Sequence, residues 1–96
     1  MSLQRQALKI VRDTKNDFAV GSETTVALIM SRLTTDDEKT AIYELRAPWG
    51  IEVITVTPYE FRANPTIRQL TQLIENRTRR AMAQLTSIKL KGMQDD

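Results

Sequence analysis

The chain has 96 residues, 41% of them hydrophobic and 27% charged, a composition typical of one small globular domain and unlike that of disordered or collagen-like chains. It has no cysteine and no histidine, which excludes a disulfide framework, a thiolate metal site, a cysteine nucleophile and the commonest general base. Net charge is only +2, and because no membrane-length apolar run or export signal is visible, we expect a cytoplasmic protein that enters no membrane.

The first predicted element is an amphipathic helix over residues 3–14. Ser2 is suited to cap its N-terminus. Apolar side chains and one threonine recur on one side at helical spacing, and charged side chains occupy the rest of the surface. This side is formed by Leu3, Ala7, Ile10, Val11 and Thr14.

Residues 24–33 are apolar at both odd and even positions, so their period fits neither a helix nor a strand cleanly. Their threonine, valine and isoleucine content, followed by a turn-like segment at 34–37, favours a buried strand. In a regular strand the side chains of Val26, Leu28 and Met30 point to one face, and those of Ala27, Ile29 and Leu33 point to the other.

Two β-rich runs, 40–46 and 51–57, are separated by a short loop that contains Pro48 and Gly50. Proline is suited to the second position of a type I turn, and glycine can take a positive φ at its end. The sequence therefore predicts a hairpin. Its register stays open, because it depends on whether Gly50 forms a bulge.

A helix over residues 35–45 is the alternative to the first strand of this hairpin. The pattern from Thr35 to Glu38 matches a capping box, in which the first and fourth side chains satisfy backbone groups at a helix start. We favour the hairpin, in which Ala41, Tyr43 and Leu45 share one face.

A long amphipathic helix is predicted over residues 65–90. Asn64 is a good N-cap before Pro65, and Gly92 ends the helix before a tail at 91–96. At about 1.5 Å per residue it is close to 40 Å long, which is more than a small three-stranded sheet needs. Its apolar positions include Ile67, Leu70, Ile74, Ala81, Leu85 and Ile88.

Together these elements predict a single α+β domain over residues 1–96, with an N-terminal helix, a three-stranded antiparallel meander within 24–57 and a long C-terminal helix in two layers. The α-β-β-β-α order is similar to that of the double-stranded-RNA-binding domain. That family's second helix opens with a basic, glycine-bearing motif, whereas Asn64-Pro65-Thr66-Ile67-Arg68 stands at this point of the chain. We therefore assign the chain to no family.

The predicted sheet is apolar on both faces, so either the helices cover opposite faces or a second copy covers one of them. Charge is also segregated along the chain. Residues 1–15 carry a net +3, residues 16–61 a net −5 and residues 62–92 a net +6. The basic C-terminal helix could therefore contact phosphates or an acidic protein surface, or it could face solvent. The side chains concerned are Arg68, Arg77, Arg79, Arg80 and Lys89.

Signatures of an enzyme are absent from the sequence. Three scattered glycines cannot form a phosphate-binding loop, and without histidine there is no familiar triad. We interpret the acidic residues 36–38 as a solvated turn rather than a cation site. The sequence thus predicts a protein with no catalytic residues, no metal and no cofactor.

Trp49 lies beside Pro48 at the tip of a tight turn. An exposed tryptophan is a natural contact for a partner's pocket, because tryptophan is enriched in interface hot spots. The other interpretation is that the indole folds back and closes one end of the core.

The sequence favours a small non-enzymatic protein-binding module, acting as a homo-oligomer or as an accessory subunit of a larger complex. In this hypothesis Trp49 and Pro48 contact the partner, and Leu70, Ile74 and Leu85 supply the core or the partner. The alternative is a nucleic-acid-binding protein whose basic helices contact phosphates.

Overall fold

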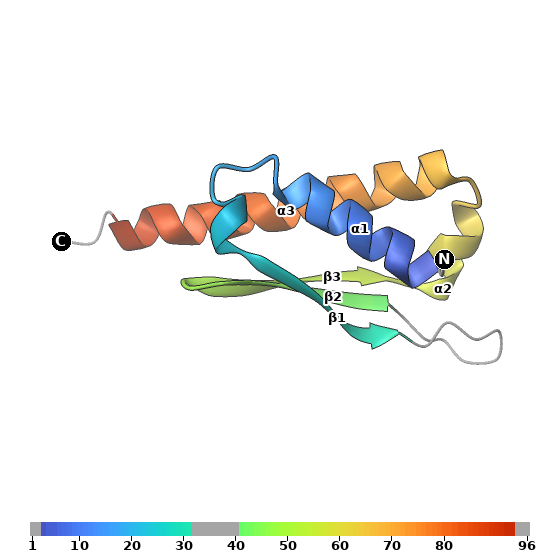
Figure 1. Cartoon of the computed structure of the whole chain (residues 1–96), viewed down its shortest axis with the longest axis horizontal. Helices are drawn as coiled ribbons and strands as arrows, with labels where there is room; N and C mark the ends of the chain where they lie inside the picture. Colours follow the sequence, from blue (N-terminus) through green and yellow to red (C-terminus); the bar gives the residue numbers. More distant parts are fainter. Residues whose placement is uncertain (1–2, 32–40, 94–96) are drawn as a thin grey trace.

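A computed structural model describes residues 3–31 and 41–93 of the chain. Its elements confirm the predicted α+β arrangement, with one sheet and helices from both ends of the chain packed beside it (Figure 1). They are, in chain order, α1 (Leu3–Lys15), the 3-10 turn η1 (Gly21–Glu23), β1 (Thr25–Ser31), β2 (Ala41–Ala47), β3 (Gly50–Val56), α2 (Pro58–Ala63) and α3 (Ile67–Met93).

The three strands form an antiparallel meander in the order β1-β2-β3, as predicted. The ambiguous apolar segment is a strand over Thr25–Ser31, and the hairpin is formed by β2 and β3. The alternative helix over 35–45 is therefore wrong from Ala41 onward, and residues 35–40, with their capping-box pattern and acidic cluster, lie outside the described residues.

The hairpin turns tightly, because Ala47 pairs directly with Gly50 and only Pro48 and Trp49 lie between them. Among the described residues no φ is positive, so Gly50 does not take the left-handed conformation that the sequence suggested. A side chain there would instead approach α3, since a Cβ atom on Gly50 would lie 3.4 Å from Cδ1 of Ile88.

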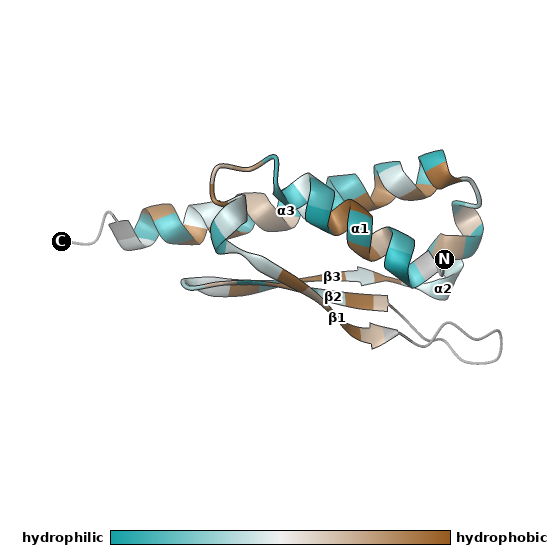
Figure 2. Ribbon diagram, viewed as in Figure 1, coloured by the Kyte–Doolittle hydropathy of each residue, from teal (hydrophilic) through white to brown (hydrophobic). Residues whose placement is uncertain are grey.

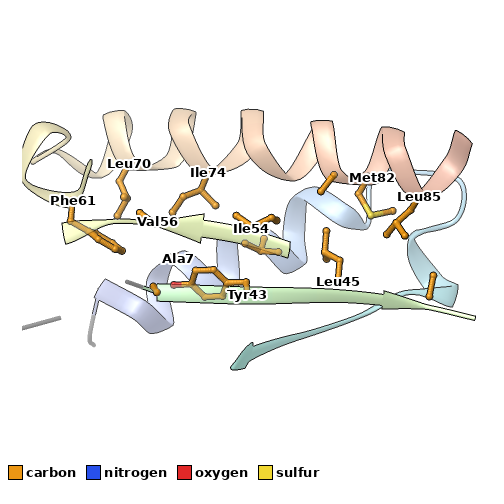
Figure 3. Close-up of a cluster of buried hydrophobic side chains, with 14 residues drawn as sticks. Ala7, Tyr43, Leu45, Ile54, Val56, Phe61, Leu70, Ile74, Met82 and Leu85 are labelled. Carbon is orange, nitrogen blue, oxygen red and sulfur yellow. The ribbon is translucent and has the colours of Figure 1, made fainter. Parts of the chain in front are cut away.

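The core lies between the sheet and the two long helices (Figure 3). Figure 2 shows hydrophobic residues along the strands and hydrophilic residues over much of the outer side of α1 and α3. Tyr43 and Leu45 are fully buried on the predicted face of β2, and the Tyr43 hydroxyl donates a hydrogen bond to the carbonyl of Gln4 in α1, 3.0 Å away. Further buried side chains come from α1, β3 and α3 and include Ala7, Val11, Ile54, Val56, Leu70, Ile74, Met82 and Leu85.

A β-bulge interrupts the pairing of β1 with β2 between Leu28 and Met30. Leu28 pairs with the inward-facing Tyr43, but Met30 pairs with Ile42, which lies on the other face of β2. Cross-strand partners share a face. The prediction that Met30 faces the same way as Val26 and Leu28 is therefore wrong, because the extra residue reverses the alternation.

Both C-terminal helices begin with capping boxes. Before α2, the hydroxyl of Thr57 accepts a bond from the backbone N–H of Glu60, whose carboxylate accepts the backbone N–H of Thr57 in return. Before α3, Thr66 and Gln69 make the same reciprocal bonds, at 3.1 and 3.2 Å. The predicted start at residue 65 with Asn64 as N-cap is therefore wrong, since Asn64 is the C-cap of α2.

The far end of α3 also differs from the prediction. The helix continues through Gly92 to Met93, so residues 91–93 are helical and do not belong to a tail. The last turns of α3 extend beyond the end of the sheet (Figure 1). The sequence predicted that this helix is longer than the sheet, because the length of a helix follows from its number of residues and the rise per residue.

Candidate protein-interaction surface

Both long helices pack against the same face of the sheet, so no described residue covers the opposite face (Figure 1). We call that opposite face the outer sheet face. The strand registers arrange its side chains in three rows that run across the strands. These rows are Met30–Ile42–Thr55, Ala27–Glu44–Val53 and Thr25–Arg46–Ile51.

Large apolar side chains remain exposed on the outer sheet face. Val53 and Ile51 on β3 are 54% and 48% exposed, Met30 on β1 is 40% exposed, and Ile29 at the adjacent bulge is 53% exposed. Single exposed apolar residues are ordinary on protein surfaces, but a contiguous apolar group marks an interaction site. These four make up half of the exposed large hydrophobic side chains of the described residues, and they gather on one sheet.

One ion pair lies in the middle of this apolar surface. The guanidinium of Arg46 donates two hydrogen bonds to Oε1 of Glu44, from Nη2 at 2.8 Å and from Nε at 3.2 Å. The two residues are separated by one position on β2, so their side chains share the outer face. The face therefore carries large apolar side chains on both edge strands, with one acid and one base side by side on its central strand.

Most of the apolar residues predicted to meet a partner lie in the core. Leu70, Ile74 and Leu85 are buried between α3 and the sheet (Figure 3). The sequence left open whether these residues contribute to the core or contact a partner, and in the structure they contribute to the core.

Trp49 folds back instead of protruding. Its indole Nε1 donates a hydrogen bond to the carbonyl oxygen of Leu85 at 2.8 Å, and the ring packs against the core. The ammonium of Lys89 lies 4.6 Å from the ring centroid, in cation–π contact. Pro48 is exposed beside it on the hairpin loop. The tryptophan thus attaches the hairpin to α3, as the second interpretation of the sequence proposed.

The predicted basic cluster is divided among several intramolecular contacts. Arg77 forms an ion pair with Glu60 and donates a bond to the carbonyl of Thr55 at 2.7 Å. The hydrogen bond from Arg77 is the main cause that lowers the pKa of Glu60, and bonds from the backbone and hydroxyl of Thr57 act in the same direction. Lys89 pairs with Glu23 at 2.8 Å.

The remaining arginines of the cluster lie on the surface of α3. Arg79 pairs with Glu75 on the same helix, at 3.4 Å. Arg68 and Arg80 are exposed and form no ion pair with another described residue. The structure therefore does not bring the predicted residues together as one free basic stripe.

The sequence indicated a sheet with two apolar faces but did not identify the residues of the uncovered one. Ile51 and Val53 could have been found, because they alternate with inward positions along a predicted strand. The contribution of Met30 depends on the bulge, and the pairing of Glu44 with Arg46 depends on which face they share. No local sequence pattern indicates that both helices pack on the same face of the sheet.

Over residues 3–31 and 41–93, no group of three or more metal-ligating side chains lies close enough together to hold a metal ion. Within the same ranges no helix combines the length and apolarity needed to cross a bilayer. No protein-family model, no curated protein and no solved structure matches this chain. Its function is therefore inferred from its own surface.

Proposed function

We propose that this protein is a non-enzymatic protein-binding module that uses its outer sheet face, as an oligomer or as an accessory subunit of a larger complex. The observation that carries the proposal is the apolar face left open by two helices that pack on the same side of the sheet. An antiparallel sheet with one solvated face ordinarily alternates apolar with polar side chains. Here Ile51 and Val53 occupy outward positions at which that alternation expects polar residues.

Burial of this face by a protein partner is energetically favourable. At roughly 25 cal/mol per Å² of apolar surface, covering a half-exposed valine or isoleucine contributes about 1–2 kcal/mol. Ile29, Met30, Ile51 and Val53 are all about half exposed. Their combined burial offsets a substantial part of the free energy that association costs.

The chemistry of the face also favours binding over catalysis. Its acid and its base, Glu44 and Arg46, are already hydrogen-bonded to each other, and the rows around them carry methyl and methylene groups. A surface of this kind suits a second protein better than a small substrate, which binds in a concave pocket with a few converging polar groups. The cytoplasmic location stays an expectation of the sequence.

Native mass spectrometry of protein purified at low ionic strength without nuclease tests the proposal. We expect the wild-type chain to carry bound polypeptide, either another copy or a different protein. Val53→Glu should lose that polypeptide, because it places a second negative charge directly across from Glu44 on the outer sheet face. The matched control is Ile67→Glu, which replaces an equally exposed apolar residue at the start of α3. Equal losses in both variants, or no bound polypeptide in any sample over a series of rising protein concentrations, would contradict the proposal.

The same spectra test the nucleic-acid alternative. Bound mass that nuclease removes would favour it, and Arg68 and Arg80 are then the first residues to replace. The structure supports it less, since Arg77 and Lys89 are occupied by Glu60 and Glu23.

A further inference from the structure

We infer that the occupant of the outer sheet face is a second copy of this chain, stacked with its β2 antiparallel to the first and related by a two-fold axis that crosses β2 at Leu45. The inference rests on the proposed function, and it adds the identity and orientation of the partner. The pattern of charges on the face carries it.

The charges form a short pattern along β2. Glu44 and Arg46 project from the outer face on either side of the inward-facing Leu45, and Arg46 is the more exposed of the two. Two sheets stack about 10 Å apart with their strands within about 30° of each other, so each side chain faces a definite row of the other sheet.

A two-fold axis across the strands at Leu45 exchanges the two charged rows. Glu44 of each copy then faces Arg46 of the other, and two ion pairs form between the copies. On β3 the same operation places Val53 opposite Ile51, so apolar side chains meet apolar side chains. On β1 it places Ala27 opposite Thr25. The face is therefore complementary to itself in this one arrangement, as a two-fold interface requires.

Other simple stackings oppose like charges or bury charge against apolar groups. A two-fold axis parallel to β2 places Glu44 over Glu44 and Arg46 over Arg46, which is repulsive. Moving the cross-strand axis by one residue, to Glu44, again opposes the two carboxylates. An axis one further residue along, at Tyr43, places Glu44 over Ile42. The charges thus select both the orientation and the register.

In this arrangement the two ends of the outer sheet face also come into contact. The row Met30–Ile42–Thr55 of one copy comes over the hairpin end of the other, where Pro48 is exposed. Three strands of seven residues give a face about 14 Å wide and about 23 Å long. Treated as flat rectangles, two such faces have a combined area of roughly 640 Å², which is below the total of about 1,000 Å² expected of a stable specific interface. The dimer is therefore expected to dissociate on dilution.

Charge reversal with mixing tests this arrangement. Glu44→Arg and Arg46→Glu each oppose like charges in a self-dimer, so each variant should be monomeric, with dimer affinity at least tenfold below that of the wild type. An equimolar mixture should form heterodimers, because one variant then presents two arginines on β2 and the other presents two glutamates, so opposite charges meet at both positions. Sedimentation velocity over a concentration series measures the association. Circular dichroism verifies that both variants are folded.

The doubly reversed variant, Glu44→Arg with Arg46→Glu, is the matched control. It restores the pair within the chain and both pairs between copies, so it should self-associate like the wild type. It should not mix with wild-type chains, since the arginine introduced at position 44 would then face the native Arg46. Preferential mixing with the wild type would overturn the antiparallel orientation.

Two further results overturn the inference. One is a wild-type chain that stays monomeric up to about 1 mM, and the other is a single-charge variant that dimerises as well as the wild type. If the wild type is monomeric but carries a different polypeptide that Val53→Glu removes, the proposed function stands and only the second copy is wrong. If no polypeptide depends on Val53, both fail.

Discussion

Gly21, in the 3-10 turn η1, and Gly50, the first residue of β3, occupy different environments. A Cβ atom on Gly21 would overlap the backbone carbonyl of Lys15, which cannot move without unwinding the end of α1. A Cβ atom on Gly50 would meet only side-chain atoms of Ile88 and Leu85, the closest at 3.4 Å, in ordinary van der Waals contact.

Gly21→Ala should therefore destabilise the fold by about 2 kcal/mol or more, as overpacking against backbone does. Gly50→Ala should change the free energy of unfolding by less than about 1 kcal/mol. Urea denaturation followed by circular dichroism measures both. Equal stabilities of the two variants would show that the path of the chain between α1 and β1 is not as described.

Glu60 gives the fold a pH dependence with a definite sign. Its pKa is lower in the folded chain, chiefly because Arg77 donates a hydrogen bond to its carboxylate. Such a group contributes stability that is fully present above its unfolded pKa of about 4.3 and is lost as the pH falls through the folded value.

Glu60→Gln should lower the free energy of unfolding by about 1–2 kcal/mol at pH 7, since charge-assisted hydrogen bonds are lost, and the difference should shrink toward pH 2. Glu75→Gln, in the exposed pair with Arg79, should change stability by less than about 0.5 kcal/mol at either pH. Denaturant titrations at the two pH values measure this. A Glu60 effect that is the same at both would contradict the assignment.

Trp49 joins the hairpin to α3 through its hydrogen bond to Leu85 and its packing on the core. Trp49→Ala should cost about 3 kcal/mol, and Trp49→Phe, which keeps an aromatic ring but loses the donor, about 1 kcal/mol. Tyr59→Ala is the control, because this aromatic side chain is exposed on α2. Thermal unfolding measures the stability of the three variants. A Trp49→Ala variant as stable as the wild type would contradict the buried indole and favour the interpretation in which Trp49 protrudes to contact a partner.

The sequence predicts an element well when the residues that determine it are close together in the chain. Helical periodicity placed α1 and α3 within a few residues, and Pro48 with Gly50 placed the hairpin. The start of α3 was missed although Thr66 and Gln69 form a readable capping box, because the adjacent Asn64-Pro65 pair offers an equally plausible start. The bulge at Leu28 was not predictable, since it is defined by the register of β1 against β2, which no pattern within β1 itself reports.

In the folded molecule, the acidic and basic segments of the chain are partly paired with each other. Glu23 and Glu60 from the acidic middle pair with Lys89 and Arg77 of the basic helix within one chain. Part of the opposite charge of the two segments is therefore neutralised by ion pairs within the chain. What the described fold leaves uncovered is an apolar face with one balanced charge pair, and this is the surface that carries the proposed function.

The most direct measurement is site-specific photocrosslinking in the protein's native cells, with a photoreactive phenylalanine analogue at position 53 or, in a separate variant, at position 67. Both positions are exposed, but only position 53 lies on the outer sheet face. We expect a discrete polypeptide adduct from position 53, with the mass of a second copy, and none from position 67. Absence of polypeptide adducts at position 53, or the same adducts from both positions, would contradict it.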